Sequence, residues 1–246
     1  MKYRKALYCL LRPKLWGALA KRVAPSIEHA IALQHRGYRT IVDVGANRGQ
    51  FSLFARMLNP DASIHAFEPL DGPGKVFAGL FAGDDRVKIR QIAIGCSDVE
   101  ASIFVTAKDD SSSLLAVEPL QQDIFGTVAS AVQTVPVRRL AACLSAEDIQ
   151  PPSLLKIDVQ GTERDVLAGS EELLPLFSAV YVECSYVSLY REQVLADAVI
   201  KWMQARGFVV GGVFNQYERP GIGPIQADFL FLRSADDHTD TGGAAQ

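Results

Sequence analysis

Short apolar runs separated by helix-length segments make up most of the chain beyond residue 40. The runs at 40–44, 63–67, 87–94, 154–159 and 180–184 are rich in Ile and Val and are almost uninterrupted by polar residues. Such near-continuous strands are typical of a parallel sheet that is covered on both faces. The segments at 50–57, 74–81, 163–174 and 193–206 have helical length. Strands and helices that alternate in this way predict a doubly wound α/β domain.

Two regions depart from this alternation. The last apolar runs, 208–214 and 228–232, are joined by residues 215–227, a Pro- and Gly-rich segment without room for a crossover helix. We therefore predict a loop there and an antiparallel pair of strands at the sheet edge. Residues 102–106 and 134–138 alternate like exposed strands, with a polar turn at 108–113. We interpret residues 97–152 as an insertion near the carboxyl edge of the sheet, where it would cap a site.

Charge divides the chain into a basic arm and an acidic body. The composition, 48% apolar and 22% charged, is that of a globular protein. Residues 1–27 hold seven of the 25 Lys and Arg and none of the 28 Asp and Glu. An acidic body is a poor partner for nucleic acid, which needs a basic face. We expect a basic helical arm over residues 1–36, which includes a helix at 27–35 that ends at Gly37. One main domain should follow over residues 37–233, and residues 234–246 should form a disordered tail.

The N-terminal arm and the cysteines indicate in which cellular compartment the protein is found. Four widely spaced Cys give neither a zinc-like spacing nor a disulfide framework. The apolar stretch at residues 6–11 is too short for a signal peptide, and no run is long enough to cross a membrane. We therefore expect a cytoplasmic protein. Leu and Trp residues among the bases of the arm leave two alternatives open: peripheral contact with an anionic membrane, or packing on the acidic body or a second subunit.

The first strand leads directly into a glycine turn, and a carboxylate follows the second strand. Gly45 lets the backbone turn and approach a ligand, and Gly49 permits close packing of the next helix. The dinucleotide fingerprint is not met, because Asn47 and Gln50 occupy its later glycine positions. Glu68 lies 19 residues beyond Gly49, where an acid accepts hydrogen bonds from ribose hydroxyls. Together these features indicate a nucleoside cofactor without phosphates.

Several short motifs together resemble those of a known family. They are Asp43-Val-Gly-Ala-Asn-Arg-Gly49, Phe67-Glu68-Pro69, Ser111-Ser-Ser-Leu114, Leu155-Lys-Ile-Asp158-Val-Gln-Gly-Thr-Glu163 and Val182-Glu183. Over roughly residues 38–233 the chain resembles the FkbM family of S-adenosylmethionine-dependent methyltransferases. The resemblance implies a class I methyltransferase fold, a Rossmann-like doubly wound sheet with a reversed terminal β-hairpin, and methyl transfer to oxygen. The residues expected to bind S-adenosylmethionine are Asp43, Gly45, Ala46, Asn47, Gly49, Glu68, Pro69 and Ala93.

Asp158 is the candidate catalytic residue, because it ends a buried apolar strand on the same crevice as Gly45. A carboxylate in that position needs partners. Three roles remain open: orienting the cofactor's amino group, acting as general base on an acceptor hydroxyl, or binding a divalent metal. We predict that Asp158 matters more for turnover than for cofactor affinity. Only Glu163 and Glu183 accompany it as further metal ligands, so we do not expect a metal.

The acceptor site is less sharply indicated. Glu183 ends the next strand, and Tyr186 follows it with an aromatic face suited to a sugar ring. Glu163 either contacts the substrate or is a first-turn acid that favours the helix dipole. Glu163, Glu183 and Tyr186 are therefore the candidate substrate-binding residues, with packing as the alternative for each.

The sequence favours an O-methyltransferase that acts on a hydroxyl of a sugar, glycan or glycosylated natural product. A nicotinamide-dependent oxidoreductase is a second hypothesis, but the chain lacks both the glycine fingerprint and a Tyr-x-x-x-Lys pair in a suitable position. A non-catalytic methyltransferase-like binding module is a third. A homo-oligomer is compatible with each of them.

Overall fold

The computed structural model describes residues 2–34, 36–106, 112–126 and 129–234. Within these ranges, a seven-stranded sheet has the order β3-β2-β1-β7-β8-β10-β9. Its strands are β1 (Thr40–Val44), β2 (Ser63–Phe67), β3 (Val87–Arg90), β7 (Ser153–Ile157), β8 (Ala179–Ser185), β9 (Phe208–Arg219) and β10 (Gly223–Arg233). The first five are parallel, whereas β10 runs antiparallel to both β8 and β9. This order confirms the predicted doubly wound sheet with its reversed terminal hairpin.

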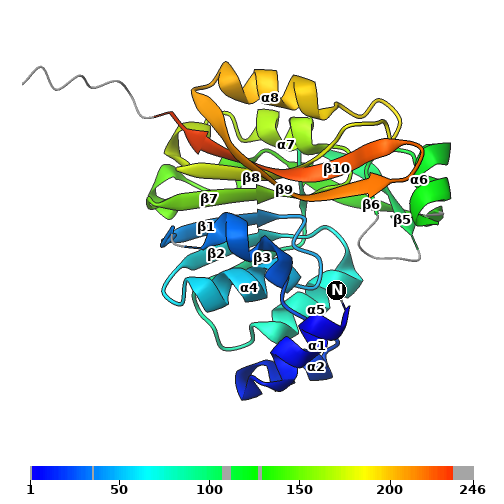
Figure 1. Ribbon diagram of the computed structural model, residues 1–246. Coiled ribbons are helices and arrows are strands. Elements are labelled where there is room, and N and C mark those ends of the chain that lie inside the picture. The colour runs from blue at the N-terminus through cyan, green and yellow to red at the C-terminus, as the bar shows by residue number, and fades with distance from the viewer. Residues whose placement is uncertain (1, 35, 107–111, 127–128, 235–246) are drawn as a thin grey trace, which may run out of the picture.

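Helices cover both faces of the large sheet. Helices α4 (Gln50–Leu58) and α5 (Asp71–Leu80) lie on one face, and α7 (Glu163–Gly169) and α8 (Ala196–Gln204) lie on the other (Figure 1). Successive residues of a strand point to opposite faces. Ile41 accordingly belongs to a core cluster with Phe51 and Phe54 of α4, and Val42 to one with Val166 and Leu167 of α7. Burial on both faces explains why β1 is apolar almost throughout.

A small second sheet stands at one end of the first (Figure 1). Its strands β4 (Ala93–Ile94), β6 (Ala129–Arg138) and β5 (Val99–Thr106) pair in that order. Strands β5 and β6 include the two runs expected in the insertion, and helix α6 (Pro119–Phe125) lies between them in the chain. Most of the polar turn expected at residues 108–113, Ser111 included, lies outside the described residues.

Two predictions about strands are wrong. Residues 87–94 were expected to form one strand, but they contribute β3 to the large sheet and β4 to the small one, with a bend between. Residues 215–227 were expected to be a loop, but β9 and β10 extend through them and leave residues 220–222 as the turn. Gly221 and Gly223 have φ angles of +83° and +96°, so the glycines serve this turn rather than a long loop.

The helices also differ from their expected bounds. Helices α7 and α8 are shorter than residues 163–174 and 193–206, and α5 starts three residues before the expected 74. The helix expected at 27–35 is divided into a 3-10 helix, η2 (Ile27–His29), and α3 (Ala30–Leu33). It ends at Leu33 rather than at Gly37. The tail expected at 234–246 lies, beyond residue 234, outside the described residues.

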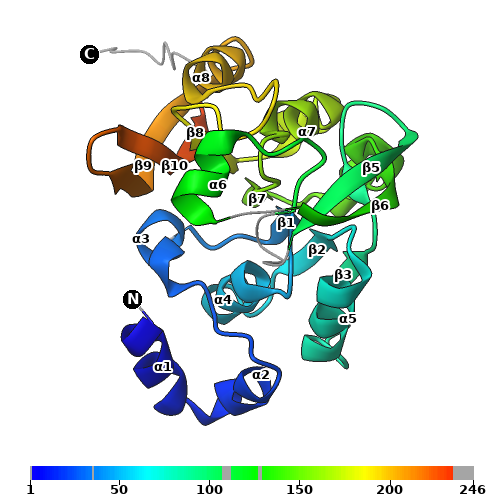
Figure 2. The ribbon, with the colours of Figure 1, turned by 90° about the vertical axis from the view of Figure 1, so that its right-hand side faces the viewer.

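The basic arm begins with a helical pair that stands apart from the sheet (Figure 2). Helix α1 (Lys2–Leu10) is followed by the 3-10 turn η1 (Pro13–Leu15) and by α2 (Trp16–Ala20). Cys9 and Leu15 are buried, whereas Leu10, Leu11 and Trp16 are more than half exposed, at 62%, 70% and 56%. No helix in the described ranges combines the length and the apolarity that crossing a membrane requires.

Candidate functional site

A cavity of about 410 Å³ opens where β1, β2, β7 and β8 end. Residues 45–47 after β1, 68–70 after β2 and 158–160 after β7 line it, together with Glu183 of β8. Ala93 of the small sheet and His29 of the N-terminal arm also line the cavity. Crevices outside the carboxyl ends of parallel strands are the usual ligand sites of open α/β sheets. The volume is within the range of small-molecule sites.

The cavity brings together most of the residues singled out from the sequence. Those that line it are Gly45, Ala46, Asn47, Glu68, Pro69, Ala93, Asp158 and Glu183. Asp43, Gly49, Glu163 and Tyr186 are not among the described residues that line it. The hydroxyl of Tyr186 instead hydrogen-bonds to Gln216, at 3.2 Å, and its ring contacts Phe229.

The glycine turn joins the ends of three strands. The φ angle of Gly45 is +77°, and a Cβ atom there would lie 1.8 Å from the carbonyl oxygen of Asp158. A side chain cannot be accommodated at this position, so the turn requires glycine. The N–H groups of Gly45 and Ala46 both donate to the carbonyl oxygen of Phe67, each at 3.0 Å. The turn after β1 is thereby fixed against β2 and β7.

Glu68 is held by the backbone on both of its carboxylate oxygens. Oε2 accepts the N–H of Asn47 and Oε1 accepts the N–H of Leu70, each at 2.9 Å. The residue is only 6% exposed. Burial raises the pKa of Glu68 to about 6, against the opposing effect of these two hydrogen bonds. A carboxylate has about four acceptor positions, so roughly two remain for a ligand in the cavity.

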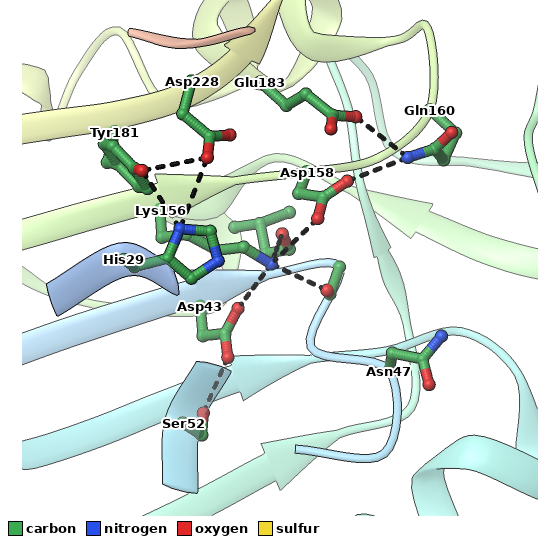
Figure 3. A network of polar contacts seen from close by, with 12 residues as sticks. His29, Asp43, Asn47, Ser52, Lys156, Asp158, Gln160, Tyr181, Glu183 and Asp228 are labelled. Atoms are coloured by element: carbon green, nitrogen blue, oxygen red, sulfur yellow. Dashed lines mark hydrogen bonds and ion pairs between the residues drawn. The ribbon is translucent and has the colours of Figure 1, made fainter. Parts of the chain in front are cut away.

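Lys156 is the central cation of the site (Figure 3). Its Nζ lies 3.0 Å from Oδ1 of Asp43 and 3.9 Å from Oδ2 of Asp158, and it donates to the carbonyl oxygen of Gly45 at 2.9 Å. The other oxygen of Asp43 accepts a hydrogen bond from Ser52 at 2.7 Å. Burial by itself would lower the pKa of Lys156, but the two carboxylates raise it above its ordinary value. The ammonium therefore stays charged and connects β1 with β7.

Gln160 joins two acidic side chains of the cavity (Figure 3). Its Nε2 donates to Oδ1 of Asp158 at 3.0 Å and to Oε2 of Glu183 at 3.1 Å. Its Oε1 accepts the hydroxyl of Tyr190 at 2.9 Å. Burial raises the pKa of Glu183 well above its ordinary value, and the nearby carboxylates of Asp158 and Asp228 raise it further. Gln160 thus holds the carboxyl groups of Asp158 and Glu183 together at the cavity.

Glu163 is buried beside the turn after β7 and is not among the described residues that line the cavity. It is 4% exposed, and its Oε1 accepts the N–H of Gly161 at 2.8 Å. Burial raises the pKa of Glu163 to about 7, although the hydrogen bonds that it accepts act in the opposite direction. The carboxyl group therefore supports the turn after β7, the feature that presents Asp158 and Gln160 to the cavity.

Sequence reasoning missed a polar cluster that involves the N-terminal arm (Figure 3). Oδ2 of Asp228, in β10, accepts hydrogen bonds from the hydroxyl of Tyr181 at 2.9 Å and from Nδ2 of Asn215 at 2.7 Å. Nδ1 of His29 lies 3.3 Å from the same oxygen and 3.0 Å from the Tyr181 hydroxyl. One signal was available: Asp228 interrupts an apolar strand, where a carboxylate needs partners.

In the described part of the chain, no three His, Cys, Asp or Glu side chains are grouped so that they could hold a metal ion together. Asp158 and Glu183 instead share the amide of Gln160.

Comparison with known proteins identifies one family. The sequence model described as "Methyltransferase FkbM domain" matches residues 43–210. The 31-O-demethyl-FK506 methyltransferase FkbM of Streptomyces tacrolimicus is 30% identical over 171 residues, which are 59% of this chain and 64% of that protein. The match therefore spans less than two thirds of this relative. The 2-O-methyltransferase NoeI of Sinorhizobium fredii is 25% identical over 185 residues, 69% of this chain and 73% of NoeI.

One solved structure that matches this chain is that of a putative tRNA (m1A22) methyltransferase of Streptococcus pneumoniae, in complex with S-adenosyl-L-methionine. It is 13% identical, with a TM-score of 0.47 over 83% of this chain and 70% of that one.

Proposed function

Since this chain belongs to the FkbM methyltransferase family, we propose that it transfers a methyl group from S-adenosylmethionine to a hydroxyl of a small acceptor. The observation that carries the proposal is the position of Glu68. Its carboxylate is fixed between the glycine turn and the end of β2 and keeps acceptor positions toward the cavity. A nucleoside with two vicinal ribose hydroxyls suits such a group.

The residues of the cavity fit this cofactor. Gly45 permits the close backbone approach that a ligand at the end of β1 needs. Ala46 and Asn47 continue this wall of the cavity, and Pro69 and Ala93 extend it on the side of the small sheet. When bound, S-adenosylmethionine supplies a methyl group attached to a sulfonium sulfur. The chain's own task is to hold the acceptor oxygen in line with that methyl and to accept its proton.

Asp158 has contacts that favour the first of its three open roles. Its Oδ2 lies near the Lys156 ammonium and its Oδ1 accepts from Gln160. Both of its oxygens therefore already have partners within the protein. Its side chain nevertheless stays 42% exposed and faces the cavity. In our proposal, Asp158 orients the positively charged end of the cofactor, and another group receives the proton of the acceptor.

A hydroxyl of a sugar, glycan or glycosylated natural product is the proposed acceptor. FkbM and NoeI, two relatives of this chain, have names that specify O-methylation. The cavity offers Glu183, whose carboxyl group is held by the side-chain amides of Gln160 and Gln226, as a hydrogen-bonding partner for a polyol. Tyr186 and Glu163 lie outside the described lining, so their role toward an acceptor stays a prediction.

Methyl-labelled S-adenosylmethionine with a panel of methyl glycosides and macrocyclic polyols tests the function. We expect label in at least one acceptor with the wild-type chain and a large loss of this transfer in Glu68→Ala. Lys75→Ala is the matched control, because Lys75 pairs with Asp71 on the surface of α5. S-adenosylmethionine binding without transfer to any acceptor would favour a binding module, and binding of NAD instead would favour an oxidoreductase.

A further inference from the structure

His29 and Asp228 come from opposite ends of the chain and meet at the wall of the cavity (Figure 3). We propose that His29 is the general base of the reaction, that its Nε2 takes the proton of the acceptor hydroxyl, and that Asp228 positions it through Nδ1. This inference rests on the proposed methyl transfer and assigns the proton acceptor, a role that our proposal does not give to Asp158.

The orientation of the imidazole is fixed on several sides. Its ring makes edge contacts with Phe51 and Tyr181, both at centroid distances of 5.5 Å. Its Nδ1 faces Oδ2 of Asp228, the Tyr181 hydroxyl and Nδ2 of Asn215. Asp228 is itself held by Tyr181 and Asn215. The strands β8, β9 and β10 thus provide a rigid support for a side chain that the N-terminal arm contributes.

The contacts of Nδ1 determine which nitrogen carries the proton. Burial alone would raise the pKa of Asp228, but hydrogen bonds from His29, Asn215 and Tyr181 keep it below its ordinary value. Nδ2 of Asn215 also lies 3.1 Å from Nδ1, but its two N–H groups have Oδ2 of Asp228 and the Tyr181 oxygen as acceptors. A lone pair on Nδ1 would face the carboxylate, which is electrostatically unfavourable, whereas an Nδ1–H group donates to it. In a neutral imidazole the other nitrogen is then an acceptor. This is the same division of roles as in an Asp–His pair that activates a nucleophile.

The free nitrogen is accessible from the cavity. Among the described residues, Nε2 of His29 has no hydrogen-bond partner, and the side chain remains 17% exposed. His29 lines the cavity together with Asp158 and the glycine turn. An acceptor in this space can therefore reach both the cofactor site and the imidazole.

The resulting step balances without any further reactant. The acceptor oxygen forms the bond to the methyl carbon with one of its electron pairs, and the carbon–sulfur bond breaks with its pair on sulfur. The hydroxyl proton passes to Nε2 of His29, whose positive charge is stabilised by Asp228 at 3.3 Å from Nδ1. The imidazolium later returns this proton to water.

The tautomer of His29 can be measured without knowing the acceptor. Long-range proton–nitrogen correlation spectra of the nitrogen-15-labelled full chain report each imidazole separately, and the chain has four His. His29→Gln identifies the signals of His29, and His65→Gln serves as the matched control. We expect a proton on Nδ1 and a bare Nε2 in the wild type above neutral pH, and loss of this preference in Asp228→Asn. A proton on Nε2 in the wild type would overturn the proposal.

Kinetics separate this inference from the proposed function. Wild type and His29→Gln are compared for S-adenosylmethionine affinity and for kcat with the methyl glycoside panel. We expect affinity within about twofold and kcat lower by about 10²–10⁴-fold, the usual contribution of a positioned base. Free imidazole should partly restore kcat in His29→Ala. If the wild type transfers methyl groups and His29→Gln does so within about threefold of its rate, His29 is not the base, while the proposed function stands. If the wild type binds no S-adenosylmethionine, the proposed function fails, and the base assignment fails with it.

Discussion

Replacing Lys156 with Met should destabilise the fold strongly, because it leaves a buried carboxylate without its counter-charge. Asp43 is fully buried, and the nearest cation in the described structure is the Lys156 ammonium at 3.0 Å. Removing one member of a buried ion pair typically costs about 3–5 kcal/mol, since the remaining charge stays desolvated. Ser52 still donates to Asp43 in the variant. We therefore expect a loss of about 3 kcal/mol, near the lower end of that range.

The assay is urea unfolding followed by far-ultraviolet circular dichroism near neutral pH. The double variant Lys156→Met with Asp43→Asn should regain at least half of the lost unfolding free energy. It removes the buried Asp43 charge that the single variant leaves without a counter-charge. Lys75→Met is the matched control: its partner Asp71 is exposed, and we expect an unchanged unfolding midpoint. A cost below about 1 kcal/mol for Lys156→Met, or no recovery in the double variant, would refute the pairing as the source of stability.

The remaining predictions concern cofactor binding by Asp158, the pH dependence of cofactor affinity and membrane contact of the N-terminal arm. Asp158→Asn should weaken S-adenosylmethionine binding at least about tenfold, measured by calorimetry, and leave saturated turnover within about threefold, measured by initial rates. Loss of turnover with unchanged affinity would instead indicate that Asp158 is the base, and chelator-sensitive activity would indicate a metal. Because burial raises the pKa of Glu68 to about 6, the carboxylate gains a proton as the pH falls from about 7 to about 5, and affinity should drop about tenfold; a Glu68→Gln variant with the same pH dependence would contradict this. The exposed Leu10, Leu11 and Trp16 among basic residues predict that the full chain sediments with anionic phospholipid vesicles at physiological salt and that a chain lacking residues 1–24 does not; if neither sediments, the arm serves packing or oligomerisation.

Much of the fold could be predicted because its signals are local. Strands β1 and β2 have the expected bounds, since both are buried on two faces and end at sharp turns. Gly45 could be placed from the strand–glycine–helix order alone, and the spacing to Glu68 placed a carboxylate in the same crevice. These inferences need only the neighbouring sequence and the general geometry of parallel sheets.

The rest depends on partners that are distant in the chain. Ala93 leaves the large sheet because Val137 pairs with it in the small one, and no local pattern encodes this choice. His29 acquires its contacts from β8, β9 and β10, and it is separated from them by almost the whole domain. Lys156 did offer a signal, because a Lys within a buried run needs a counter-charge. The sequence around Lys156 does not reveal that Asp43 and Asp158 both supply this counter-charge.

Calorimetric titration of the full chain with S-adenosylmethionine is the most direct test that the cavity at the ends of β1, β2 and β7 binds this cofactor. We expect the wild type to bind it and NAD to give no heat of binding. Glu68→Ala should lose about 1.5–3 kcal/mol of binding free energy, the scale of hydrogen bonds to a charged group. Folded Glu68→Ala with unchanged affinity would contradict the placement of the ribose hydroxyls. A wild-type chain that binds NAD and not S-adenosylmethionine would contradict the proposed methyl transfer itself.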